Sequence, residues 1–133
     1  MEDENSVATL ADAESFPHIA GLGEEARAGA FFTMLYPSTQ FVFAQDCMWW
    51  LNVLPLAADR SILEVGGCFP ETVISAPDFE ANAAAYYDRW EKVAREDMSI
   101  LERQQRALNS VLYKPGPLSG RDDLVQQLGV III

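Results

Sequence analysis

Asp97 is the residue whose surroundings most suggest chemistry, because it is an acid among apolar neighbours on a predicted helix. It lies in the stretch WEKVAREDMSILERQQ, residues 90–105. Side chains three and four positions apart are neighbours on a helix surface. Those positions around Asp97 hold only apolar residues: Val93, Ala94, Ile100 and Leu101. A buried ionised carboxylate is costly unless it protonates, pairs or binds a metal. Asp97 therefore pairs with an arginine or a backbone amide, lies at the boundary of the apolar face, or ligates a metal.

The other acids of this helix have basic residues one turn away. The expected pairs are Asp88 with Lys92, Glu91 with Arg95, Glu96 with Lys92 and Glu102 with Arg106. Such exposed pairs contribute roughly a few tenths of a kcal/mol each. Because Glu96 has Lys92 as a neighbour, it is a weaker candidate for a metal ligand than Asp97.

The chain has 133 residues, of which 50% are hydrophobic, so we expect one domain with a modest core. Its formal charge of −11 argues against nucleic acid and anionic membrane as partners, since both require clustered Lys and Arg. No apolar run is long enough for a transmembrane helix. The start shows no secretory signal, so we expect a cytoplasmic protein.

Histidine and cysteine are too few for a zinc or iron–sulfur site. The chain contains only His18, Cys47 and Cys68, with no Cys-x-x-Cys or Cys-x-His pair. We interpret His18 as a loop or boundary residue. The two cysteines are expected to be buried free thiols, although a disulfide between neighbouring strands is an alternative.

The pattern along the chain predicts an α+β fold, in which an antiparallel sheet is followed by a long helix. Residues 1–29 read as a polar, solvated N-terminal segment, and the rest as one domain over 30–133. Within that domain we predict strands over about 30–74, a long helix over about 76–110 and a short helix over about 120–128.

Several local signals refine this prediction. The run TQFVFAQDCMWWLNVLPL, residues 39–56, reads as one strand that is covered on both faces or bulged. The turn AADRS joins it to the next strand as a hairpin with a loop of about four residues. Gly66 and Gly67 indicate a bulge or a close backbone approach. Ser75 is predicted to cap the long helix, and Ser119 with Asp122 to begin the short one.

Four stretches, in this order, resemble the C-terminal part of the catalytic domain of Rieske-type non-haem iron oxygenases, the aromatic-ring-hydroxylating oxygenase α subunits. They are LYP, LNVLPLAADRS, WEKVAREDMSILERQQ and YKPGPLS. The single pieces are short, but their order and spacing extend over most of the chain after Phe31. The resemblance implies a helix-grip (START-like) fold, in which a curved antiparallel sheet grips a long C-terminal helix.

The resemblance also implies a site. In that family two histidines and one carboxylate hold a mononuclear Fe(II) that activates dioxygen to oxidise a small organic substrate. The carboxylate comes from the long helix, at the position of Asp97, and this implies Asp97 as the metal ligand. No further catalytic residue is implied. The residues implied to line the substrate pocket are Tyr86, Tyr87, Trp90 and Val93.

The chain departs from the family pattern because it lacks the Cys-His pairs of the Rieske [2Fe–2S] cluster and both iron-binding histidines. We therefore expect the C-terminal portion of an oxygenase, inactive alone and without tightly bound iron. Its implied partners are the remainder of the α subunit, with the Rieske domain and the histidines, a reductase or ferredoxin donor, and further copies in a homo-oligomer. The alternatives are a metal-free module that binds small hydrophobic ligands in a helix-grip pocket, and an interaction subunit that docks through its incomplete sheet edge and its apolar GVIII tail.

Overall fold

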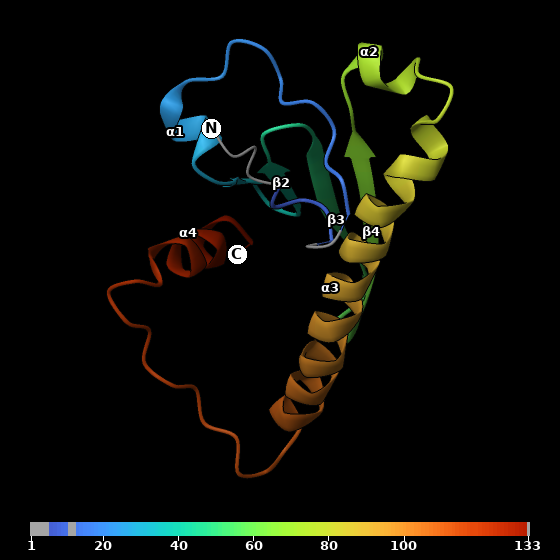
Figure 1. The fold of residues 1–133 in the computed structure, drawn as a ribbon. Coiled ribbons are helices and arrows are strands. Elements are labelled where there is room, and N and C mark those ends of the chain that lie inside the picture. The colour runs from blue at the N-terminus through green and yellow to red at the C-terminus, as the bar shows by residue number, and fades with distance from the viewer. Residues whose placement is uncertain (1–5, 11–12, 133) are drawn as a thin grey trace.

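The computed structural model describes residues 6–10 and 13–132, and it has the predicted α+β architecture (Figure 1). A four-stranded antiparallel sheet lies beside one long helix, α3, which follows it in the chain. The elements in order are α1 (Glu24–Arg27), β1 (Phe31–Leu35), β2 (Thr39–Phe43), β3 (Met48–Ala57), β4 (Arg60–Cys68), α2 (Glu71–Ile74), α3 (Phe79–Leu108) and α4 (Asp123–Ile132).

The sheet is a meander in which sequential strands are neighbours, in the order β1-β2-β3-β4. The prediction of one strand over residues 39–56 was wrong, because the chain reverses between β2 and β3. The amide of Ala44 donates to the carbonyl of Cys47 at 2.9 Å and closes the turn. The polar residues Gln45 and Asp46 lie inside that turn. Their side chains suit a turn better than the interior of a strand that is apolar on both faces.

The hairpin between β3 and β4 is confirmed, with a shorter loop than predicted. Ala57 pairs with Arg60, so two residues form the turn, and the register shifts between Pro55 and Ala57. The close approach predicted at the glycines is also confirmed. A Cβ on Gly67 would overlap the indole of Trp90 on α3. The missing side chain therefore lets the Trp90 indole lie against the backbone of β4.

Helix α3 runs without a break over 30 residues, close to the predicted range. Its predicted cap at Ser75 was wrong: Ser75 ends the short helix α2, and its hydroxyl donates to the carbonyl of Glu71 at 2.8 Å. Residues 71–74 form a helical turn of their own, so α3 begins later, after Asp78. The predicted cap was therefore assigned to the start of α3, whereas Ser75 lies at the end of α2.

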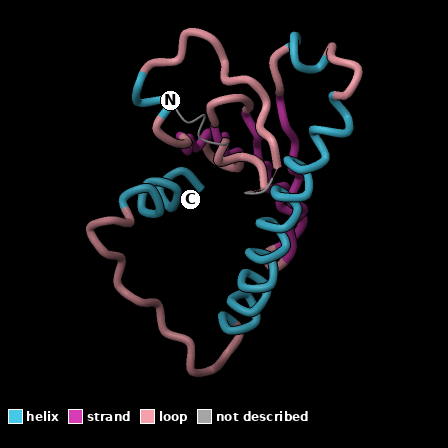
Figure 2. The backbone as a smooth tube through the Cα atoms, viewed as in Figure 1, coloured by secondary structure: helices cyan, strands magenta, loops and turns pink. Residues whose placement is uncertain are grey.

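The C-terminal helix begins as predicted and ends later. The carboxylate of Asp122 accepts from both the amide and the hydroxyl of Ser119, at 2.7 Å each. Helix α4 extends to Ile132, beyond the predicted end at 128, because the residues after it continue the apolar helical pattern. A long irregular connection over residues 109–122 separates α3 from α4 (Figure 2). Tyr36 donates from its hydroxyl to the carbonyl of Leu124 at 3.1 Å and joins α4 to the sheet region.

The core lies under the first half of α3, around stacked and edge-to-face aromatic rings. Its principal members are Phe16, Phe69, Phe79, Tyr86 and Trp90. The N-terminal segment contributes to this core through Ser6, Ala8, Thr9 and Phe16, which are all buried. Of its acids, Glu2, Asp3, Glu4 and Asp12 lie outside the described residues.

The second half of α3 is not covered, and Ile100 and Leu101 are about 60% exposed. Within the described part of the chain, Arg95 and Glu91 form an ion pair at 2.5 Å, and the other predicted pairs do not form. Glu96 therefore has no ion pair with Lys92. None of the described helices combines the length and the apolarity that crossing a bilayer requires.

Candidate functional site

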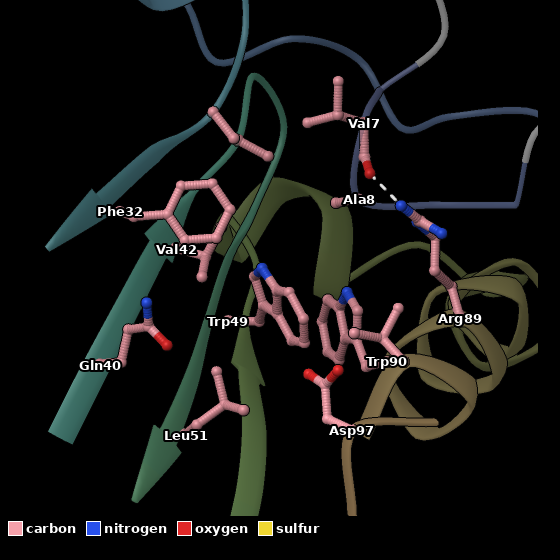
Figure 3. Close-up of a pocket in the computed structure, with 13 residues that line it drawn as sticks. Val7, Ala8, Phe32, Gln40, Val42, Trp49, Leu51, Arg89, Trp90 and Asp97 are labelled. Carbon is pink, nitrogen blue, oxygen red and sulfur yellow. Dashed lines mark hydrogen bonds between the residues drawn. The ribbon is translucent and has the colours of Figure 1, made fainter. Parts of the chain in front are cut away.

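A cavity of about 350 Å³ lies between α3 and the sheet (Figure 3). Helix α3 contributes one face through residues spaced three and four positions apart, and β1, β2 and β3 contribute the other. Its lining residues are Val7, Ala8, Ala30, Phe32, Gln40, Val42, Ala44, Trp49, Leu51, Arg89, Trp90, Val93 and Asp97. The wall is therefore mostly aromatic and aliphatic, with a few polar side chains at defined positions.

Asp97 faces this cavity, below the two indoles in the view of Figure 3. Its side chain is exposed, and it makes no hydrogen bond or ion pair with any residue that the structure describes. The ion pair and the amide contact that the sequence left open are therefore not formed. Glu96, the competing acid, does not line the cavity. Asp97 is thus a carboxylate with free oxygen atoms at the mouth of an apolar space.

Trp90 and Val93 lie on the same stripe of α3 and also line the cavity. The Trp90 side chain is buried, and its ring stacks on that of Trp49 with centroids 5.5 Å apart. Gly67 of β4 makes room for this stack. The indole nitrogen of Trp90 has no hydrogen-bond acceptor among the described residues. An unpaired buried donor is uncommon in native structures and marks a place where a partner is missing.

The two predicted tyrosines lie outside this cavity. Tyr86 is fully buried in the aromatic core. Tyr87 is 43% exposed and lines a second pocket of about 490 Å³, formed by α3 and the middle of β4. Their contact with a substrate stays a prediction.

A buried polar cluster, which the sequence analysis missed, lies next to the cavity and centres on Asp46. Its carboxylate is 0% exposed and accepts from the Ser6 hydroxyl at 2.5 Å and from the Tyr86 hydroxyl. The Tyr86 oxygen in turn accepts from the amide of Phe16 at 2.7 Å. The cluster therefore joins the N-terminal segment, the β2–β3 turn and α3.

This cluster changes the acidity of two groups. Burial raises the pKa of the Tyr86 hydroxyl far above its ordinary value, and the hydrogen bond to Asp46 adds to this. Burial likewise raises the pKa of the Cys47 thiol, with a contribution from the neighbouring Asp46 charge. Both groups therefore stay protonated at neutral pH. A signal for the cluster was present in the sequence, because Gln45 and Asp46 interrupt an apolar run.

No three side chains of His, Cys, Asp and Glu come together as metal ligands within residues 6–10 and 13–132. His18 is half-buried in a separate pocket near α2, away from Asp97. Both cysteines are free, as predicted; Cys47 is buried, but Cys68 is exposed, which corrects the prediction that both would be buried. The strand position of Cys68, near the end of β4, leaves it uncovered. The described residues therefore supply one carboxylate and not the full ligand set of an iron site.

Comparison with protein families gives one match. The family model described as "Ring hydroxylating alpha subunit (catalytic domain)" matches residues 1–129. No curated protein and no solved structure matches the chain. The family match covers the sheet, α3 and most of α4, including all cavity-lining residues.

Proposed function

The chain belongs to the ring-hydroxylating α-subunit family, whose catalytic domain its residues 1–129 match, and from this premise we propose that it supplies Asp97 as the carboxylate ligand of a mononuclear non-haem iron. The family generally uses such an iron together with a Rieske cluster. In the proposal the cavity between α3 and the sheet forms one wall of the substrate site. The iron would activate dioxygen, and the chain's residues would orient the substrate and exclude water.

The free carboxylate of Asp97 is the observation that carries this proposal. Other acids on α3 are solvent groups that do not line the cavity, whereas Asp97 lines it together with Trp90 and Val93. Asp97 has no hydrogen bond or ion pair with a described residue, so no internal partner competes with a metal. A ligand on a helix is also held more rigidly than one on a loop.

The described residues alone do not fit a complete iron site, because they bring no second or third ligand to Asp97. We therefore propose that two histidines come from another part of the oxygenase, together with the Rieske cluster and its reductase or ferredoxin donor. The chain alone should bind no iron tightly and turn over no substrate, since affinity comes from several preplaced ligands. Stoichiometric iron in the purified chain that is lost in Asp97→Ala would show that the ligand set is already complete.

A grafted site tests whether Asp97 can reach a metal in the cavity. Gln40 and Leu51 are cross-strand partners on β2 and β3, and both line the cavity. Directly opposed residues place their Cβ atoms about 5 Å apart on one face of a sheet. The double variant Gln40→His, Leu51→His therefore presents two imidazoles on the wall that faces Asp97.

We expect Co²⁺ to bind this double variant more tightly than the unmodified chain, and this gain to be lost when Asp97→Asn is added. The matched control is Glu96→Gln, which removes a neighbouring charge that does not line the cavity. Visible absorption of bound Co²⁺ reports coordination directly. Equal binding with and without the Asp97 carboxylate would refute its role as a ligand.

A second candidate function is the binding of a small apolar ligand without a metal. The stacked Trp49 and Trp90 and the aliphatic wall support it, because such pockets bind small molecules in many proteins. The two functions differ at Asp97. In a binding module Asp97→Asn leaves ligand affinity unchanged, whereas in the reconstituted oxygenase it abolishes turnover.

A further inference from the structure

Strand β1 forms one edge of the sheet, and its outer side is unpaired within the described part of the chain. Its five residues, Phe31–Leu35, pair with β2 on the inner side. No other residue that the structure describes hydrogen-bonds to the backbone of β1. All five side chains are exposed, with Phe32 at 68% and Leu35 at 59%. The outer side of β1 therefore presents free N–H and C=O groups with which another extended strand can pair.

Strand β1 lacks the features that usually prevent such pairing. Edge strands of soluble proteins commonly carry a charged residue, a proline or a bulge. The sequence FFTML of β1 contains no charge and no proline, and its register with β2 is unbroken. Strand β4, at the other edge, contains Arg60 and Glu64, its register with β3 is irregular near its start, and its Gly67 lies against Trp90 of α3. Of the two edges, β1 is therefore the one suited to receive a further strand.

The sequence of β1 is also complementary to itself. When two β1 strands pair antiparallel about a twofold axis at Thr33, Phe32 lies opposite the partner's Met34. In the same register Phe31 lies opposite the partner's Leu35, and Thr33 opposite the partner's Thr33. Opposed residues share one face of a sheet, so apolar side chains meet on both faces. Any other centre places some of these residues opposite positions outside the partner's β1, so this register alone pairs the whole strand.

Such a pairing also covers an open side of the cavity between α3 and the sheet. Phe32 lines the cavity on the side opposite Trp90, yet it is 68% exposed (Figure 3). The β2 residues opposite Phe32 and Met34 are Val42 and Gln40, which both line the cavity. Phe32 and Met34 therefore lie on the face of the sheet that is turned to α3. In the paired register the partner's Met34 packs against Phe32, a favourable contact between a thioether and a ring, and it adds to the cavity wall.

We propose that two copies of the chain associate through β1, with Thr33 at the twofold axis, and that their two four-stranded sheets become one continuous sheet. The self-complementary register favours a second copy over another peptide. A net charge of −11 on each copy opposes association in general, but β1 carries none of that charge. Because the pairing is isologous, each β1 edge is used up and assembly ends at the dimer. The association involves neither Asp97 nor a metal.

Sedimentation velocity of the full chain over a range of concentrations measures this association, and we expect a monomer–dimer equilibrium without larger species. Thr33→Lys places two like charges beside each other at the twofold axis, so it should weaken the dimer by about tenfold or more. The matched control is Ser61→Lys, which puts the same charge in place of an exposed hydroxyl on β4, the other edge strand. It should leave the dissociation constant within about twofold. Circular dichroism checks that both variants are folded.

Disulfide trapping tests the register. The background variant Cys68→Ser removes the exposed cysteine, and Cys47 stays because it is buried. On oxidation with copper–phenanthroline, Thr33→Cys should link two copies, because the opposed Cα atoms lie about 5 Å apart. Leu35→Cys alone should not link, because its two copies lie about 13 Å apart along the strands, beyond the reach of a disulfide. A mixture of Leu35→Cys and Phe31→Cys should link, since these positions are opposed.

The proposal is overturned if the full chain stays monomeric at every concentration, a measurement that does not depend on any variant being folded. It is also overturned if Thr33→Lys and Ser61→Lys weaken the dimer equally, if larger assemblies form, or if Leu35→Cys links to itself as readily as Thr33→Cys. Because these experiments contain no metal, they can fail while the grafted cobalt site still depends on Asp97. Conversely, a dimer through β1 would stand if the cobalt experiment failed.

Discussion

Removal of one oxygen atom, in Tyr86→Phe, should destabilise the fold although it keeps the shape of the side chain. The Tyr86 hydroxyl donates to the carboxylate of Asp46 and accepts from the amide of Phe16 at 2.7 Å. The ring stays in place in the variant, because its stacking on Phe16, with centroids 5.0 Å apart, does not use the hydroxyl. The effect therefore isolates the two hydrogen bonds.

Its magnitude follows from what the variant leaves behind. The Asp46 carboxylate is 0% exposed, and in the variant it would keep the Ser6 hydroxyl and the Cys47 thiol as hydrogen-bond partners. A hydrogen bond to a charged group contributes about 1.5–3 kcal/mol, and an unsatisfied buried amide costs about 1–3 kcal/mol. We expect a loss of about 3 kcal/mol in the free energy of unfolding, with water entry into the cluster reducing the upper limit. This is a large part of the 5–15 kcal/mol that is typical of a domain.

Urea denaturation of the full chain, followed by circular dichroism, measures this loss as a shift in midpoint at constant slope. Tyr87→Phe is the matched control, since Tyr87 is the next residue on α3 and is 43% exposed. It should change the free energy of unfolding by less than about 0.5 kcal/mol. Equal effects of the two substitutions would refute the reasoning, because the Tyr86 hydroxyl would then be no more important than a solvated one.

Three further changes test other parts of the structure. Gly67→Ala should destabilise the chain by about 1–3 kcal/mol, measured by thermal unfolding, because the added methyl group overlaps the indole of Trp90. The pKa values of Cys47 and Tyr86 are raised in the fold, whereas the unfolded chain loses these two protons at ordinary values, about pH 8.5 and 10. Above those values the free energy of unfolding should therefore fall by about 1.4 kcal/mol per pH unit for each group. Urea midpoints measured against pH should show a smaller fall for Tyr86→Phe. Arg95→Gln should cost less than about 0.5 kcal/mol in the same assay, since its ion pair with the glutamate one turn earlier is highly exposed.

Helix α3 and the β3–β4 hairpin were predictable because their signals are local. Over residues 79–108 no Gly or Pro interrupts the helical pattern, and α3 has this range. The turn at residues 58–59 follows from its sequence in the same way. The pair Ser119 and Asp122 also acts between near neighbours, and it forms as predicted. Periodicity and turn chemistry suffice where the interacting residues are close in sequence.

The buried cluster was not predictable by the same means, because its members are far apart in sequence. Ser6 and Asp46 are separated by 40 positions, as are Asp46 and Tyr86. Gln45 and Asp46 interrupt the apolar run over residues 39–56, but the residues near them in sequence do not identify Ser6 and Tyr86 as the partners of the Asp46 carboxylate. Periodicity describes which faces are apolar but not which distant groups meet there.

The two acids Asp46 and Asp97 have opposite environments, and only that of Asp97 differs from what its apolar neighbours in sequence indicate. Asp97, among apolar residues on α3, is exposed and unpaired within the described chain, because the second half of the helix has no layer packed over it. Asp46, in a turn, is fully buried because hydroxyl groups from two other segments satisfy it. A satisfied buried carboxylate stabilises a fold, whereas an exposed carboxylate without a protein partner can bind an external cation. The difference in partners therefore makes Asp46 a structural residue, and it leaves the Asp97 carboxylate available for the metal-ligand role that we propose.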